Sequence, residues 1–276
     1  MALGLGKRPG VAVVEIHGII GGRVRVPVYE RLLDSIARSH RYRAVLLDID
    51  SPGGSATGSE LLYHSLQKVA QQKPVVAYVR GIGASGGYYL CCAATQVVAL
   101  PTALVGSIGV IYLRPILEDL LAKIGVQFSV FKGGRLKDMS GFWRNPTPEE
   151  SEKFQELVAE IYDNFVQVVA TGRSMDEVRV RELATGEVFT ARRGNDLGLI
   201  DELAGFDRAL ELAAHLGQAK PRPIWMRPPR SLSERLLGRL GGGSPAVALL
   251  ASEAQRLLTG GIYYLGPSYI ASDYVE

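Results

Sequence analysis

The chain has 276 residues, of which 47% are hydrophobic and 21% are charged, and its formal net charge is +3. This balance is typical of a folded globular protein and argues against a disordered chain. The basic residues are spread along the chain without a dense stripe, so we expect no nucleic-acid partner. The first ten residues lack the apolar run of a signal peptide, and no run of about 20 apolar residues predicts a membrane span. We therefore expect a soluble, cytoplasmic chain and leave peripheral membrane association open.

The elements predicted over the first hundred residues alternate between strands and helices. Strands are predicted over 11–16, 44–49, 75–79 and 97–99, and helices over 28–37, 57–70 and 88–94. Thr57 and Glu60 have the spacing of a capping box at the start of the second helix. The alternation predicts βαβ units in an α/β fold with a largely parallel sheet.

The second half of the chain continues this pattern. A helix is predicted over 114–124, strands over 126–131 and near 188, and a last helix over 206–216. A long helix starts at a second capping box, formed by Thr147 and Glu150, with Pro148 at its first helical position. We expect these elements to complete one domain.

The composition changes after Lys220, where prolines and then a run of glycines replace the periodic pattern. Such stretches are typical of linkers and extended segments. We predict a catalytic domain over residues 1–220 and a C-terminal tail over residues 221–276 that serves as an oligomerisation segment.

Two glycine-containing turns follow two of the predicted parallel strands. Because the carboxyl ends of parallel strands share one edge of the sheet, both turns should face one crevice. Ser85 lies at the predicted start of a helix, where backbone amides favour a developing negative charge. Gly86 can donate its amide there, and Gly54 in the other turn can approach closely because it has no side chain. A serine with two amides is suited to acyl transfer.

The same loop also fits a second template. Gly81, Gly83 and Gly86 have the spacing of a dinucleotide-binding fingerprint between a strand and a helix. The acidic ribose ligand expected about 20 residues later is missing, since no Asp or Glu lies between Ser85 and Glu118. Nucleotide binding is therefore disfavoured.

Metal and cofactor sites are not expected. The two cysteines, Cys91 and Cys92, are adjacent, which suits small buried hydrophobes better than a disulfide. No Cys/His spacing typical of a metal site is present. We predict that the chain uses no cofactor and no metal.

A serine hydroxyl needs a base to become a good nucleophile. None of the four histidines lies between Ser85 and Ala214, so a histidine-based triad is disfavoured. A lysine can take this role when burial lowers its pKa from about 10.4. Lys132 and Lys137 both follow the predicted strand over 126–131, and spacing alone does not choose between them.

Several motifs of the chain resemble the signal peptide peptidase A family of serine proteases, which has the Clp/crotonase fold. The similar segments, in family order, are residues 51–54, 84–89, 105–110, 132–138, 186–190 and 198–201. The resemblance implies that Lys137 is the base and that Ser107 orients its amine. It also implies that Gly54 and Gly86 form the oxyanion hole.

The resemblance further implies a homo-oligomeric ring acting on signal-peptide-like or unfolded peptides, with small or apolar side chains near the cut. The chain departs from the family at Asp50, where asparagine is common, and in lacking the usual membrane anchor. Two other functions remain as alternatives: an acyl-CoA enzyme of the crotonase kind, and a ring scaffold with an inactive site.

Overall fold

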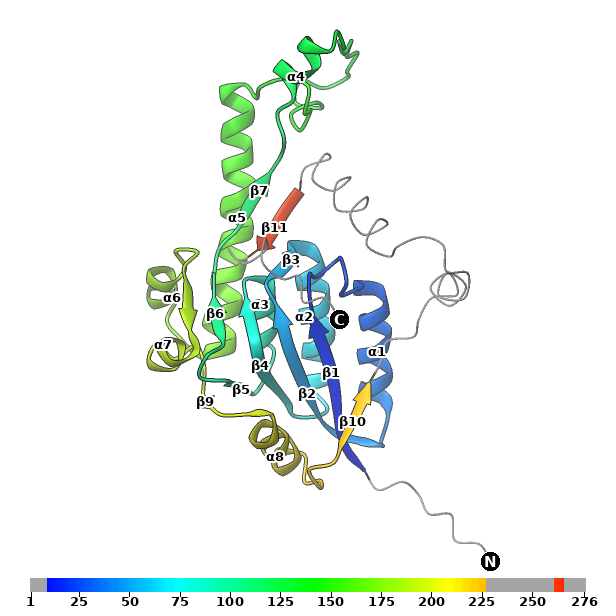
Figure 1. The fold of residues 1–276 in the computed structure, drawn as a ribbon, viewed down its shortest axis with the longest axis vertical. Helices are drawn as coiled ribbons and strands as arrows, with labels where there is room; N and C mark the ends of the chain where they lie inside the picture. The colour runs from blue at the N-terminus through cyan, green and yellow to red at the C-terminus, as the bar shows by residue number, and fades with distance from the viewer. Residues whose placement is uncertain (1–8, 227–260, 266–276) are drawn as a thin grey trace, which may run out of the picture. The chain divides into compact units, whose positions relative to one another are not determined.

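The computed structural model describes residues 9–226 and 261–265 (Figure 1). The described chain divides into two compact units. The first comprises residues 9–109, 165–226 and 264–265, and the second comprises residues 110–164 and 261–263.

The first unit is built on an eight-stranded sheet. Six strands form its main path in the order β10-β1-β2-β4-β5-β9, and every neighbouring pair on this path is parallel. These strands are β10 (Pro223–Met226), β1 (Gly10–His17), β2 (Tyr42–Ser51), β4 (Val75–Ala84), β5 (Gln96–Ala99) and β9 (Glu202–Leu203). The α/β class with a largely parallel sheet is therefore confirmed.

Two short strands extend the sheet beside the end of β4. β6 (Leu104–Gly106) pairs in parallel with the last residues of β4, and β8 (Val188–Thr190) pairs antiparallel with β6. The strand predicted near Val188 is thus confirmed. Because Ala84 and Gly106 are register partners, the residues that follow them start from adjacent points at one edge of the sheet.

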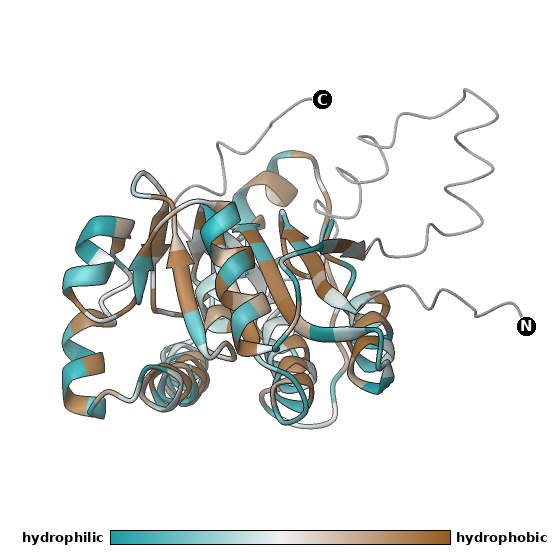
Figure 2. Cartoon of the chain, turned by 90° about the horizontal axis from the view of Figure 1, so that it is seen from below, coloured by the Kyte–Doolittle hydropathy of each residue, from teal (hydrophilic) through white to brown (hydrophobic). Residues whose placement is uncertain are grey.

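The central strands are buried on both faces, as in other parallel sheets covered by helices. On one face, alternate residues of β1, β2 and β4 pack against α8 (Phe206–Leu216). The small residues Ala209, Ala213 and Ala214 let this helix approach the sheet closely. Figure 2 shows the hydrophobic colour running along the central strands, while the helices have one hydrophobic and one hydrophilic face.

The remaining helices of the first unit include α1 (Val26–Arg38), α2 (Ala56–Ala70) and α3 (Gly86–Cys91). α6 (Glu177–Leu183) and α7 (Ala191–Asp196) flank β8 in the sequence. The N-cap of α2 is Ser55, whose hydroxyl accepts a hydrogen bond from the Gly58 amide at 3.2 Å. The predicted capping box was therefore placed wrongly, because Thr57 already lies inside the helix.

Part of the segment predicted as a tail belongs to the first unit. Residues 223–226 form β10, which extends the main sheet beside β1. Tyr264 is buried and stacks on Tyr89, with ring centroids 5.2 Å apart, and it also contacts Phe165. Residues 227–260 and 266–276 lie outside the described residues, and the division at residue 220 stays a prediction.

The second unit contains β7 (Ile111–Leu113), α4 (Glu118–Lys123) and the first part of α5 (Pro148–Arg173). β7 pairs antiparallel with β11 (Gly261–Leu265), so that Tyr112 lies opposite Ile262. The capping box of α5 is confirmed: the Thr147 amide donates to the Glu150 carboxylate at 2.8 Å, and the Glu150 amide donates to the Thr147 hydroxyl at 3.2 Å.

Two predictions in this unit are wrong. The helix predicted over 114–124 is limited to α4, and its first residues leave the helix to follow β7. Residues 126–131 form no strand. The apolar side chains of this segment are exposed, and in the described part of the chain it pairs with no neighbouring strand that would stabilise an extended ladder.

Candidate active site

Ser85 lies at the sharp turn between β4 and α3. Its backbone has φ of 52° and ψ of −119°, a combination that costs a non-glycine residue about 1–3 kcal/mol. The turn is held by two backbone hydrogen bonds, from the Ser85 amide to the Gly106 carbonyl and from the Tyr89 amide to the Ser85 carbonyl, both 2.8 Å long. The surrounding structure thus fixes a strained conformation at the nucleophile predicted from the sequence.

The Ser85 side chain is completely buried, and its hydroxyl finds no hydrogen-bond partner among the described residues. It also makes no capping bond to α3, although Ser85 is the N-cap residue. Buried hydroxyl groups are normally paired, and an unpaired one at a strained position indicates a functional role. The hydroxyl is therefore free to bond to a group that enters the site.

The glycine turn after β2 lies directly against the start of α3. Gly53 and Gly54 belong to the short strand β3 (Gly53–Ser55). A Cβ atom added to Gly86 would lie 3.3 Å from the Gly54 nitrogen, and one added to Gly53 would lie 2.7 Å from the Gly86 nitrogen. The two amide groups predicted to form the oxyanion hole are thus neighbours, and only glycine leaves room for this approach.

Ser107 directly follows β6, just as Ser85 directly follows β4. Their preceding residues, Gly106 and Ala84, are register partners, so both serines leave the same edge of the sheet. Ser107 is buried, has a φ of 50°, and donates its amide to the Glu187 carbonyl at 2.6 Å. Its predicted contact with a lysine amine stays a prediction.

Both candidate lysines lie in the second unit, in the loop between α4 and α5, and not at the end of a strand as predicted. The Lys132 amine is paired with the Asp138 carboxylate. Lys137 is exposed in this unit and makes no ion pair with any described residue. Ser85, Ser107, Gly54 and Gly86 belong to the first unit.

Asp50, which stands where asparagine is common in the family, has a structural role. One of its carboxylate oxygens accepts a hydrogen bond from the Ile82 amide at 2.9 Å. The register between β2 and β4 shifts at this point, and Asp50 satisfies an amide that the ladder leaves unpaired. Gly81 and Gly83 are residues of β4 itself, so they form no phosphate-binding loop of the dinucleotide kind.

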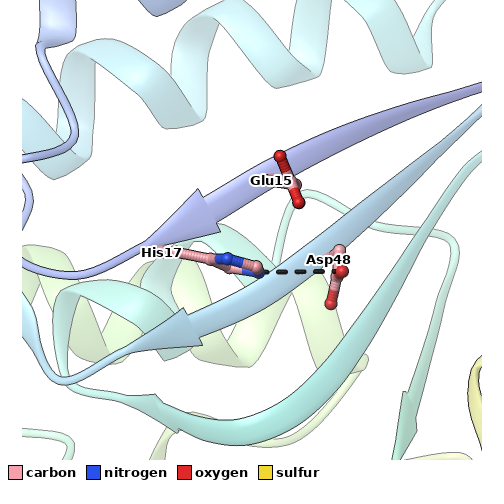
Figure 3. A group of neighbouring side chains, drawn as sticks. All are labelled: Glu15, His17 and Asp48. Carbon is pink, nitrogen blue, oxygen red and sulfur yellow. Dashed lines mark ion pairs between the residues drawn. The ribbon is translucent and has the colours of Figure 1, made fainter. Parts of the chain in front are cut away.

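One group of polar residues was missed by the sequence analysis. Glu15 and His17 of β1 lie beside Asp48 of β2, with one ligand-type atom of each within 4.8 Å of the others (Figure 3). Asp48 was visible as the charged residue in a run of apolar ones, and Glu15 and His17 have the two-residue spacing of one strand face. Their meeting depends on the register of the sheet, which the sequence does not contain.

Comparison with known proteins finds similarity to peptidases. The model of Peptidase family S49 matches residues 67–220. A Synechocystis protein described as a protease is 36% identical over 234 residues, which cover 84% of each chain. The chloroplastic serine protease SPPA of Arabidopsis thaliana is 36% identical over 76% of this chain and 33% of its own length. A signal peptide peptidase SppA of Enterococcus faecium is 35% identical over 65% of this chain and 52% of its own.

The fold and these matches define the chain as a peptidase. More particularly, it belongs to peptidase family S49, the signal peptide peptidase A family, and the Clp/crotonase-like fold class is confirmed. In the described part of the chain, no helix combines the length and the apolar character needed to cross a bilayer.

Proposed function

We propose that the chain is a serine endopeptidase in which Ser85 is the nucleophile and Lys137 is the general base. The observation that carries this proposal is the buried, unpaired Ser85 hydroxyl on a strained turn beside the Gly54 and Gly86 amides. An acyl-transfer site needs a nucleophile held in one position and two donors for the oxyanion, and these three residues supply them.

The charges in the second unit favour Lys137 over Lys132 as the base. A general base must be able to lose its proton near neutral pH, and an ion pair with a carboxylate stabilises the protonated amine. Lys132 has such a partner in Asp138, whereas Lys137 has none among the described residues. Lys137 is therefore the candidate lysine whose amine no carboxylate of the described residues already engages.

The proposed reaction has two halves. The Lys137 amine takes the proton of the Ser85 hydroxyl while its oxygen attacks the scissile carbonyl carbon. The Gly54 and Gly86 amides stabilise the oxyanion, and protonated Lys137 gives its proton to the leaving amine, which leaves an acyl-enzyme on Ser85. Water then attacks the ester carbonyl while Lys137 takes its proton, the bond to the Ser85 oxygen breaks, and Lys137 returns the proton to that oxygen as the acid product leaves. Ser107 orients the amine throughout.

We also propose that the substrates are signal-peptide-like or unfolded peptides with small or apolar side chains near the cut. The support is the name of the Enterococcus relative and the complete burial of Ser85, which an extended strand can reach more easily than a folded surface. The proposal includes a homo-oligomeric ring, because the second unit exposes many large apolar side chains.

Acylation of Ser85 tests this proposal. The chain would be treated with a peptide carrying an acylating ester, and mass spectrometry would locate the adduct. We expect the acyl group on Ser85, no adduct in Ser85→Ala, and at least about a 100-fold slower acylation in Lys137→Ala, since general base catalysis contributes that much or more. Lys132→Ala is the matched control and should react at the native rate. An adduct on another residue would overturn the assignment.

A further inference from the structure

A polar cluster lies on one face of the sheet, outside the proposed active-site groups. Glu15 and His17 are two residues apart on β1, so their side chains leave the same face of the strand. Asp48 is the register partner of Glu15 on β2 and points to that face as well. Figure 3 shows the His17 ring directed toward Asp48, with the Glu15 carboxylate beside them.

One nitrogen of the His17 ring lacks a hydrogen bond. Its Nε2 atom is buried and makes no hydrogen bond with any described residue. His17 Nε2 forms an ion-pair contact with an Asp48 oxygen at 3.6 Å, which is too long for a hydrogen bond but close to the separation of two ligands bound to one small metal ion. Buried polar atoms rarely lack a hydrogen bond, so this nitrogen, although in an ion pair with Asp48, can take a closer partner.

Asp48 keeps binding capacity although it is paired with Arg80. The Arg80 guanidinium donates to both carboxylate oxygens, at 3.0 Å and 2.5 Å. A carboxylate offers about four lone-pair positions, and this pairing uses two of them. Arg80 would then act as an outer partner that fixes the orientation of the ligand, as carboxylates and amides do around other metal sites. Glu15, Asp48 and Arg80 together leave one net negative charge, which favours a cation.

We propose that Glu15, His17 and Asp48 bind one divalent transition-metal ion of the zinc class. One imidazole nitrogen and two carboxylate oxygens form a three-ligand set that suits zinc and its neighbours, with water in the remaining position. The ion would join the carboxyl ends of β1 and β2. Beside these ends, the Gly18 amide donates to the Asp50 carbonyl and the Ser51 hydroxyl donates to the Gly18 carbonyl. The ion would therefore brace the segment that leads to Gly54.

Direct metal titration of the full chain tests the proposal. After treatment with a chelator, the protein would be titrated with zinc chloride by calorimetry, and with cobalt chloride by visible absorption. We expect one ion per chain, an absorption band from low-coordinate cobalt, and a melting temperature that rises with zinc. His17→Ala and Glu15→Gln should each weaken binding by at least about tenfold, since even the loss of an outer partner has an effect of 10–100-fold.

His64→Ala is the matched control, because His64 likewise lies near a carboxylate, that of Glu60 at 3.8 Å, but is exposed on α2. It should bind zinc as the native chain does. The proposal is overturned if no saturable binding occurs, if His17→Ala and Glu15→Gln bind normally, or if His64→Ala abolishes binding. If His17→Ala does not fold, zinc binding by Glu15→Gln decides the outcome, because Glu15 is partly exposed and its substitution is tolerated more easily. Peptide cleavage is not needed for any of these measurements.

Discussion

At the scale of single residues, the site depends on a conformation that the rest of the chain must impose. Ser85 adopts a positive φ, which is unfavourable for serine, while its hydroxyl forgoes a capping bond to α3. Both costs are offset by the packing of α3, whose residues are all buried, and by the backbone bond to Gly106. The same packing encloses the vicinal thiols, and burial raises the pKa of Cys92 to about 12, so neither cysteine competes as a nucleophile near neutral pH.

Gly86→Ala should slow peptide cleavage strongly while leaving the protein folded. The new Cβ would lie 2.5 Å from the Ser59 hydroxyl, which must shift away from its hydrogen bond to the Ser55 carbonyl, and 3.3 Å from the Gly54 nitrogen, which must move slightly. Misaligning a proposed oxyanion donor weakens its hydrogen bond in the transition state, and loss of such a donor costs about 100-fold or more in rate. Steady-state peptide cleavage would measure kcat, and circular dichroism would check the fold.

Gly205→Ala is the matched control for this change, because an added Cβ there meets no atom within 4 Å. It should keep the native kcat. A fully active Gly86→Ala enzyme would show that the tight contact between the two glycine segments is dispensable for the reaction.

At the scale of elements, the loop that carries Lys137 is held from both sides. The half-buried Arg114 guanidinium donates to the carbonyls of Met139, Gly141 and Arg144, at 2.6, 2.6 and 2.7 Å. Arg144 in turn donates to both carboxylate oxygens of Glu150, at the first turn of α5. The loop is therefore anchored to a helix terminus without forming a strand.

This anchor makes the stability of the protein depend on pH. Hydrogen bonds from Arg144, opposed by burial, and a further bond from the Thr147 backbone lower the pKa of Glu150 from 4.5 to about 2. A lowered pKa in the folded state means that the stabilisation is complete above pH 4.5 and is lost as pH falls toward 2. Glu150→Gln should lower the free energy of unfolding by about 1.5–3 kcal/mol at pH 7 and by little at pH 2. Urea unfolding at each pH would measure it.

The neighbouring substitution Glu149→Gln serves as the control for this pH dependence. Glu149 is paired with Arg135 on the exposed side of the helix, where an ion pair contributes about 0–1 kcal/mol. Its unfolding free energy should follow that of the native protein at every pH. Parallel pH curves for the native protein and Glu150→Gln would contradict the anchor.

The sequence predicted elements well where burial sets the pattern and poorly where it does not. Periodicity located α1, α5 and α8, whose apolar residues recur on one face, and apolar runs located β2 and β4, whose residues are buried on both faces of the sheet. The apolar run over 126–131 has the same composition as a buried strand but lies exposed, and no local signal separates the two cases. Ser85, Gly54 and Gly86 were predictable from turn chemistry, whereas the cluster of Glu15, His17 and Asp48 requires the sheet register.

At the scale of the whole molecule, exposed apolar surface is concentrated in the second unit. Phe131 is 95% exposed and Ile124 is 63% exposed, and several neighbours are nearly half exposed. Clusters of this kind usually mark an interaction surface. In the proposed ring, copies of the chain would cover them.

If the chain forms the proposed ring, the particle in solution should have several times the mass of the single chain, which is 29.8 kDa. Light scattering coupled to gel filtration would measure its mass. Phe131→Ser should shift the particle toward the single-chain mass, because burying a serine in place of phenylalanine loses most of the apolar contact. Val178→Ser changes a residue that is 70% exposed in the first unit and should leave the mass unchanged. A native protein of 29.8 kDa would contradict the ring.

The most direct test of the central claim is the pH dependence of peptide cleavage in the native protein and in Ser85→Ala, Lys137→Ala and Lys132→Ala. A fluorogenic peptide with apolar and small side chains would be followed from neutral to basic pH, because a general base must be deprotonated before it can accept a proton. The Ser85/Lys137 dyad predicts a rate that rises with pH in the native protein and in Lys132→Ala, and no measurable cleavage in the other two variants. Native-like cleavage by Lys137→Ala would contradict it.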